Sequence, residues 1–335
     1  MKNIKNYDYK IDFVIPWVDG NDPNWLNEKN KYLNIKGDSS INRFRDFDNL
    51  KYLFRGIEKF APWVNKIFFV TWGHLPEWLD TTNGKIRIVK HEEFIPKEYL
   101  PTFNSNVIEL NLHRIKDLSE HFVLFNDDLF LLKRTKPTDF FKGGLPRDMY
   151  VEFIKDNCSD RHSTLRANNI KILNKYFNKK DVLETNKKKI FNIIYKKNNL
   201  KTFYSRKYTN FCDFLNYHLT QSFLKSTFEN VWNLEYQALD LSCKNKFRYI
   251  TDIGQSLCRY FQLLSGNFSP YKTLGKYFII KDNNSKLKKV IKRKKYKIIC
   301  INDASILIDF EKTKQDINNT LEHILPSISK FEKTT

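Results

Sequence analysis

The sequence predicts an α/β fold that combines a largely parallel sheet with an inserted helical subdomain. Between residues 11 and 132, short apolar segments of strand character alternate with segments whose apolar residues recur at helical spacing. Such alternation favours right-handed βαβ units, which build parallel sheets. After Pro146 helical spacing dominates, and strand patterns return near residue 277. We find no internal repeat and no long linker rich in Pro, Gly or Ser, so we expect one compact unit.

The expected segments are a core over 1–150, a helical subdomain over 151–275 and a return to the core over 276–335. Within the core, a first strand starts at Ile11 and ends in an Asp-Gly turn, and Asp48 or Asn49 can cap the first long helix. The other predicted core elements are strands at 66–71, 86–90 and 122–132, helices at 50–60 and 106–121, and a short turn or helix at 76–79.

The second half of the chain predicts mostly helices. The expected helices cover 168–177, 186–195, 211–228, 231–242, 252–264 and 311–324, and the expected strands cover 277–280 and 297–301. Residues 286–297 carry eight Lys or Arg in twelve positions. Their apolar residues fit an amphipathic helix poorly, so we predict a solvated hairpin or loop there.

One apolar run, Phe122 to Leu132, is broken in its middle by Asn126, Asp127 and Asp128. Its halves are short and rich in aromatic residues, which predicts two buried strand segments with the acids at a strand end. Adjacent carboxylates favour a compensating cation, and oxygen ligands suit Mg²⁺ or Mn²⁺. The carboxyl ends of strands are also where open α/β sheets bind ligands. The alternative is that the two acids only cap a turn.

Composition excludes several classes of protein. The 335 residues are 41% hydrophobic and 15% aromatic, which argues against disorder. No apolar run approaches the length of a membrane span, and residues 1–10 lack the apolar segment of a signal peptide, so we expect a soluble cytoplasmic protein. The cysteines never form a C-x-x-C pair, which indicates neither a disulfide framework nor a zinc site. They are Cys158, Cys212, Cys243, Cys258 and Cys300.

The net charge of +20 attracts polyanions such as nucleic acid, anionic lipid headgroups or acidic glycans, unless it reflects a compositional bias toward Lys, Asn and Ile. No zinc-finger, RNP-like or helix-turn-helix pattern occurs, so we expect no nucleic-acid partner. For residues 286–297, the functional interpretation is attachment to an anionic membrane face, where each basic residue contributes about 1 kcal/mol.

Two polar groups in the helical part have both a functional and a structural interpretation. His218 shares a face of its predicted helix with Gln221 and Lys225. A His accepts a proton well at neutral pH, although a single His in a helix is more often structural. Arg248, close to Asp252, could clamp phosphate oxygens or form a surface ion pair. The residues alone favour the structural interpretation of both groups.

Several stretches, in order along the chain, resemble the Stealth family, which includes bacterial capsular-polysaccharide phosphotransferases and the catalytic region of animal N-acetylglucosamine-1-phosphotransferase. Residues 11–23 (IDFVIPWVDGNDP) resemble its first conserved region, and residues 43–128, from RFRDFDN to the NDD break, resemble its second. Residues 218–225 with 247–252 resemble the third region, and residues 300–304 the fourth.

The resemblance implies transfer of a sugar-1-phosphate from a UDP-sugar to a hydroxyl of a glycan acceptor. Such a reaction makes a phosphodiester and releases UMP, in the synthesis of a capsular or cell-surface polysaccharide. The resemblance also implies a Rossmann-like, GT-A-like core over 1–150 that binds the nucleotide sugar, with the acceptor side and catalytic residues in 151–275. The enzyme would work in the cytoplasm or at the inner face of the membrane, as a monomer or an oligomer.

Roles for individual residues follow from the same resemblance. Asp127 and Asp128 would hold Mg²⁺ or Mn²⁺, which neutralises the diphosphate, and Asp128 would thereby belong to the catalytic set. Arg114 and Arg248 would bind phosphate oxygens whose charge changes in the transition state. His218 would deprotonate the acceptor hydroxyl.

A further set of residues would lie near the nucleotide: Asp19, Gly20, Asn21, Asp46 and Asn49. Two alternatives stay open. A metal-dependent GT-A-type glycosyltransferase would use the same donor but release UDP. A basic protein that holds polyanions without turnover would show binding that depends steeply on salt and survives EDTA.

Overall fold

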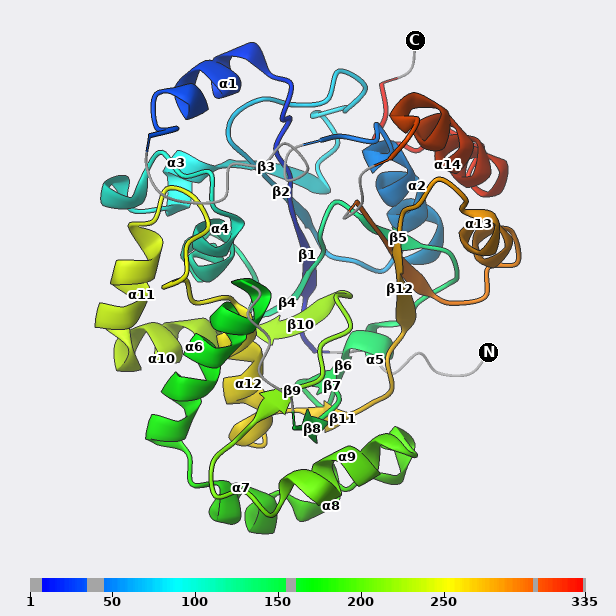
Figure 1. Cartoon of the computed structure of the whole chain (residues 1–335). Helices are drawn as coiled ribbons and strands as arrows, with labels where there is room; N and C mark the ends of the chain where they lie inside the picture. Colours follow the sequence, from blue (N-terminus) through cyan, green and yellow to red (C-terminus); the bar gives the residue numbers. More distant parts are fainter. Residues whose placement is uncertain (1–7, 35–44, 155–160, 304–306, 334–335) are drawn as a thin grey trace.

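The computed structural model describes residues 8–34, 45–154, 161–303 and 307–333 (Figure 1). The first seven residues, Arg43, Cys158 and Ala304 of the stretches considered above lie outside the described residues.

The main sheet has five strands in the order β10-β4-β1-β2-β3. Strands β1 to β4 are parallel to their neighbours, and β10 runs antiparallel to β4. This arrangement confirms a Rossmann-like α/β core with a mostly parallel sheet. The order reverses between β1 and β4, which makes that pair the topological switch point. The strands are β1 Ile11–Pro16, β2 Ile67–Thr71, β3 Ile86–Lys90, β4 His121–Leu124 and β10 Gln221–Leu224.

The core of this sheet is apolar on both faces because helices cover both sides. Phe13 and Val14, neighbours on β1, are both fully buried and belong to two different apolar clusters. Continuous burial of this kind is typical of parallel strands. The predicted helix over 50–60 is confirmed as α2 Leu50–Phe60, and its Leu53 and Ile57 are fully buried.

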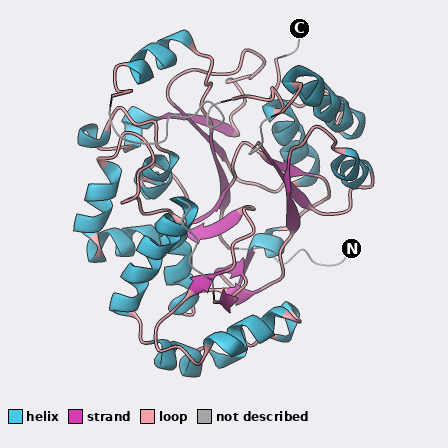
Figure 2. Cartoon of the chain, in the orientation of Figure 1, coloured by secondary structure: helices cyan, strands magenta, loops and turns pink. Residues whose placement is uncertain are grey.

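A second sheet has the order β12-β13-β5. Its strands form a magenta group apart from the main sheet in Figure 2. It contains β5 Leu129–Leu131, β12 Gly275–Ile279 and β13 Ile298–Asn302, with β5 antiparallel to β13. The run from Phe122 to Leu132 therefore gives two buried strands, as predicted, but they belong to different sheets. The chain leaves β4, passes through Asp127 and Asp128, and enters the second sheet.

Helices pack around both sheets (Figure 1). The longer ones are α1 Pro23–Asn30, α6 Arg161–Tyr176, α7 Lys179–Thr185, α9 Asn198–Ser205, α10 Lys225–Leu234, α11 Tyr236–Cys243, α12 Ser256–Leu264, α13 Ser285–Lys292 and α14 Phe310–Ile324. Short elements complete the list: α3 His91–Phe94, α4 Ser105–Leu110, α5 Pro137–Phe140, α8 Lys187–Ile190, β6 Phe141–Lys142, β7 Leu145–Asp148, β8 Glu152–Phe153, β9 Asp213–Phe214, β11 Ser269–Pro270 and 3₁₀ turns at 97–99, 112–114 and 193–195.

Several predicted elements are wrong in extent or type. The helix over 231–242 is divided, because α10 ends at Leu234 and α11 begins at Tyr236. The helix over 106–121 ends early, because α4 stops at Leu110 and a 3₁₀ turn follows. The helix over 186–195 is only α8 and a 3₁₀ turn.

The helix over 211–228 is wrong because pairing with other strands overrides its helical spacing and forms β9 and β10. The basic run over 286–297 is helical, not a loop. Leu287, Val290 and Ile291 lie one turn apart on α13 and are buried.

In the part of the chain that the structure describes, no helix has the length and apolar character needed to cross a membrane. The division at residues 150 and 275 stays a prediction.

Candidate active site

The switch point of the main sheet gathers polar residues from separate parts of the chain. Asp19, Gly20 and Asn21 follow β1, and Asp127 and Asp128 follow β4. Because β1 and β4 are parallel neighbours, both loops leave the same edge of the sheet. A ligand crevice is expected at this position in open α/β sheets.

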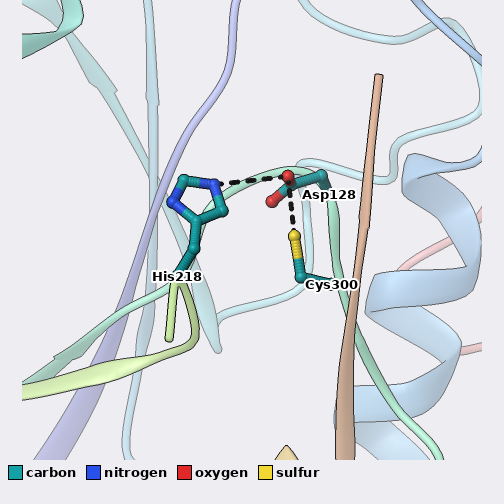
Figure 3. Close-up of side chains that lie close together, drawn as sticks. All are labelled: Asp128, His218 and Cys300. Carbon is teal, nitrogen blue, oxygen red and sulfur yellow. Dashed lines mark hydrogen bonds and ion pairs between the residues drawn. The ribbon is translucent and has the colours of Figure 1, made fainter. Parts of the chain in front are cut away.

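His218 reaches this edge through the pairing of β10. Gln221 at the start of β10 lies opposite Leu124 at the end of β4, so the turn before β10 sits beside the loop after β4. His218 is in that turn, with φ of 49°, and not in the predicted helix. Its ring nitrogen Nε2 lies 3.6 Å from Asp128 Oδ2 (Figure 3).

Asp128 sets the protonation of His218. Burial alone would lower the pKa of His218, but the hydrogen bond and negative charge of Asp128 outweigh burial, and the pKa is raised. Asn126 also lies near the ring, with 3.5 Å between its Nδ2 and His218 Nε2. The pair therefore joins a basic imidazole to a carboxylate.

Cys300 approaches Asp128 from the second sheet. In the antiparallel pairing of β13 with β5, Cys300 lies opposite Leu129, next to Asp128. Its Sγ donates to Asp128 Oδ2 at 3.0 Å (Figure 3). The Asn302 amide lies 3.4 Å from the same oxygen. The other oxygen, Oδ1, is buried and has no hydrogen-bond partner among the described residues.

Three carboxylates crowd the site. Partial loss of surrounding water and the negative charges of Asp128 and Asp46 raise the pKa of Asp127, which is itself exposed. Burial raises the pKa of Asp46, and the charges of Asp48 and Asp19 act in the same direction. Mutual repulsion of this kind favours a cation between the groups.

Arg248 and Glu109 form a second charged group beside His218. Arg248 Nη2 donates to Ser105 Oγ at 2.6 Å. Burial raises the pKa of Glu109, and the positive charges of Arg248 and His218 oppose this rise. Glu109 thus connects Arg248 electrostatically with His218. The sequence did not single out Glu109, because a lone acid in an apolar helix carries no signal of its own.

Two other predicted site residues, Arg114 and Asn49, have contacts or burial of their own. Arg114 is exposed, donates to Asn111 Oδ1 at 2.9 Å and stacks on Trp232, with 4.7 Å from its guanidinium carbon to the ring centre. None of its described contacts is with the carboxylates. Asn49 is buried at the start of α2.

The loop after β1 and the segment before α2 are fixed by hydrogen bonds. The backbone N–H of Asp19 donates to His74 Nε2 at 2.7 Å, and the N–H of Asn21 donates to Asp19 Oδ1 at 2.8 Å. Gly20 between them is buried. Arg45 donates twice to Asp303, each time at 2.7 Å, which ties the residue before Asp46 to the chain after β13.

The donor set fits a divalent cation. Among the described residues, Asp128, His218 and Cys300 offer ligand atoms within 4.8 Å of one another. Burial and the charge of Asp128 raise the pKa of the Cys300 thiol, which agrees with its role as a hydrogen-bond donor to Asp128. Carboxylate oxygens remain, and the unpartnered Oδ1 of Asp128 is one of them. Oxygen ligands are those that Mg²⁺ and Mn²⁺ prefer.

Comparisons with known proteins agree with the resemblance described above. Models of Stealth conserved region 1 and conserved region 2 match residues 9–37 and 43–147. The capsular polysaccharide phosphotransferase WcwK of Streptococcus pneumoniae is 44% identical over 328 residues, covering 96% of this chain and 99% of that protein. The receptor polysaccharide phosphotransferase WefC of Streptococcus oralis is 38% identical, covering 96% and 99%.

Among solved structures, the galactosyltransferase LgtC in complex with donor and acceptor sugar analogs aligns with 95% of this chain and 98% of its own, at 10% identity and a TM-score of 0.40. The fold assignment rests on the strand order and not on this likeness. The likeness of residues 218–252 and 300–304 to the third and fourth Stealth regions stays a prediction. Identity of 44% over nearly the whole of both chains shows that this chain belongs to the Stealth family and is a transferase.

Proposed function

We propose that this enzyme transfers a sugar-1-phosphate from a UDP-sugar to a hydroxyl of a growing glycan, with formation of a phosphodiester and release of UMP. The observation that carries the proposal is the Asp128–His218 pair beside Asp127 at the switch point of the sheet. The relatives named polysaccharide phosphotransferases support the same reaction class.

In this proposal Asp127 and Asp128, with Asp46 close by, hold Mg²⁺ or Mn²⁺. The ion would neutralise the diphosphate of the donor. Asp19, Gly20 and Asn21 lie beside the nucleotide, since they leave the neighbouring strand end. Arg248 supplies positive charge to the phosphoryl oxygens, where charge changes during transfer.

His218 acts as the general base. Its raised pKa makes the neutral imidazole a stronger base toward the acceptor hydroxyl, and Asp128 stabilises the imidazolium that forms. The proton moves from the acceptor oxygen to the ring, and that oxygen bonds to phosphorus while UMP leaves.

A pocket beside His218 suits the acceptor. Asn216, Tyr217, Leu219 and Thr220, the neighbours of His218 in its turn, line this pocket, and residues 139–149 and 271–274 contribute further polar and aromatic side chains. Arg259 is held there by Asp148, with bonds of 2.7 and 2.8 Å, and Arg147 stacks on Tyr271 at 4.0 Å. Flat rings and fixed hydrogen-bond donors are suited to a sugar.

The test uses the full-length protein with Mg²⁺, a panel of UDP-sugars and a glycan acceptor pool, and identifies the nucleotide released. We expect UMP that depends on acceptor and disappears with EDTA. The His218→Gln variant should lose about a hundredfold in turnover, while the matched change of the exposed His323, His323→Gln on α14, should lose little. Release of UDP would replace the proposal by glycosyl transfer. Polyanion binding that survives EDTA, without released nucleotide, would replace it by a binding protein.

A further inference from the structure

All charged side chains in the segment from Lys187 to Tyr208 are positive. It carries eight Lys or Arg and no Asp or Glu, and seven of these eight basic residues are exposed. The segment forms α8, a 3₁₀ turn and α9, and it lies along the lower edge of the molecule in Figure 1. A positive surface of this kind attracts an anionic partner.

Helix α9 turns its large apolar side chains outward. Leu200, Phe203 and Tyr204 lie one turn apart on one face, and they are 58%, 55% and 63% exposed. The opposite face carries Thr202 and Ser205, both fully buried. A surface helix normally packs its apolar face on the core. Here the inward face is the polar one.

Buried hydrogen bonds explain the inward face. The Ser205 hydroxyl donates to Glu152 Oε2 at 3.1 Å, and the Thr202 hydroxyl accepts from the Glu152 backbone N–H at 3.2 Å. Lys179 forms a buried ion pair with Glu152 at 2.8 Å and donates to the Ser205 carbonyl at 2.8 Å. The helix is therefore anchored by polar contacts, and its exposed apolar face is a fixed part of the fold.

Neighbouring residues extend the exposed face. Ile193 is 89% exposed and Tyr208 is 41% exposed. The Arg206 guanidinium lies 5.4 Å from the centre of the Phe203 ring, and Lys207 Nζ lies 5.2 Å from the centre of the Tyr208 ring. We call the whole surface the α9 patch, and it consists of Ile193, Lys196, Lys197, Leu200, Lys201, Phe203, Tyr204, Arg206, Lys207 and Tyr208.

We propose that the α9 patch binds the surface of an anionic lipid bilayer. Lysine and arginine side chains would meet lipid phosphates, while the aliphatic and aromatic side chains enter the headgroup boundary. An acidic polymer would neutralise the charges of the lysines but would leave the apolar side chains of Ile193 and Leu200 in water. Helix α13, the other basic run, differs because Leu287, Val290 and Ile291 are buried in the core.

The experiment measures flotation of the full-length protein with vesicles at low salt, without donor or acceptor, so it does not depend on the proposed transfer. One set of vesicles is phosphatidylcholine alone, and the other contains equal parts of phosphatidylcholine and phosphatidylglycerol. One variant combines Lys196→Gln, Lys197→Gln and Lys201→Gln, and another combines Phe203→Ser and Tyr204→Ser. The matched control removes three charges from α13 by Lys286→Gln, Lys289→Gln and Lys292→Gln.

We expect wild type to float only with the anionic vesicles. The triple change in the α9 patch should weaken binding by on the order of a hundredfold, and the aromatic double change by roughly tenfold. The α13 control should bind nearly as wild type does. Equal losses in the control and the α9 triple variant would overturn the proposal, as would undiminished binding of the aromatic variant. A change from dimer to monomer in the variants, without vesicle binding by wild type, would make the patch an interface between copies.

Discussion

The two ends of the main sheet each hold a carboxylate, and the two differ in their burial and their hydrogen bonds: Asp12 is fully buried and Asp128 is half-buried. At the amino end of β1, Asp12 is fully buried, and its oxygens accept hydrogen bonds from Asn65, the Lys66 N–H and the Ser119 N–H at 2.7, 3.1 and 2.9 Å. At the carboxyl end of β4, Asp128 Oδ1 has no such partner within the described residues.

This difference in hydrogen bonding indicates a structural role for Asp12 and agrees with the proposed catalytic role of Asp128. Asp12 joins the loops that lead into β2 and β4, and the protein itself supplies every partner it uses. Asp128 lies next to the carboxylate of Asp127, and one of its own oxygens lacks a hydrogen-bond partner among the described residues, which is costly unless a ligand supplies one. Uncompensated charge at a strand end is typical of functional sites, and it supports the proposed position of the cation and the phosphorylated donor.

The largest expected effect is on catalysis, in the Asp128→Asn variant. Loss of this carboxylate should lower kcat/KM about a thousandfold, because it removes the proposed metal ligand and the partner of His218. The free energy of unfolding should stay unchanged or rise, because one source of repulsion disappears. Steady-state kinetics and urea denaturation measure the two quantities. The exposed Asp181 of α7 provides the control, Asp181→Asn, which should change neither; a drop in stability with Asp128→Asn would contradict the comparison.

Asp12→Ala should produce the opposite result. Two backbone N–H groups and the Asn65 amide would lose their acceptor in a site without water, which should lower the free energy of unfolding by about 3 kcal/mol. Turnover per folded molecule should stay close to that of wild type. Urea denaturation, with activity normalised to the folded fraction, checks this. If Asp12→Ala removed activity while the fold stayed intact, the assignment of a purely structural role to Asp12 would be wrong.

A smaller expected effect, on stability at acid pH, concerns a buried histidine that is neutral in the folded protein. His91, the first residue of α3, is buried, and neither ring nitrogen has a partner in the described part of the chain. Burial and the charge of His74 lower the pKa of His91 to about 3. The unfolded chain binds this proton below about pH 6.5, so stability is complete above that pH and is lost as pH falls toward 3. At pH 5 the loss should be about 2 kcal/mol.

Urea midpoints between pH 8 and pH 5 test this expectation. The His91→Leu variant should show a shallower dependence on pH than wild type, whatever its absolute stability. The exposed His323 provides the control, because His323→Leu should leave the slope as it is. Identical slopes in wild type and His91→Leu would show that His91 is protonated in the folded protein.

The sequence predicted the elements whose signal is local. The strands of the core and α2 were predicted because their apolar residues are continuous or recur at helical spacing. The acids at 127 and 128 were visible because they interrupt an apolar run. The helix over 106–121 was wrong because α4 ends at Leu110 and the chain tightens into a 3₁₀ turn at 112–114, which spacing alone does not reveal.

The partners of Asp128 could not be predicted, because they depend on strand register. His218 was assigned to a helix, and its contact with Asp128 follows only from the antiparallel pairing of β10 with β4. Cys300 was noted as a free cysteine, and its position follows from the pairing of β13 with β5. The register between two distant strands cannot be deduced from the spacing of residues along one sequence.

The passage of the chain from one sheet to the other at Asp127 and Asp128 restricts how related sequences can vary. The pairing of β10 with β4 positions His218, and the pairing of β13 with β5 positions Cys300. The two contacts of Asp128 therefore depend on the registers of two different pairs of strands. A single-residue insertion within β10 or β13 would turn the neighbouring side chain to the opposite face of its sheet. Insertions and deletions should therefore accumulate in the connecting loops, while the lengths of these two strands, and of the loop between β4 and β5, stay fixed across the family.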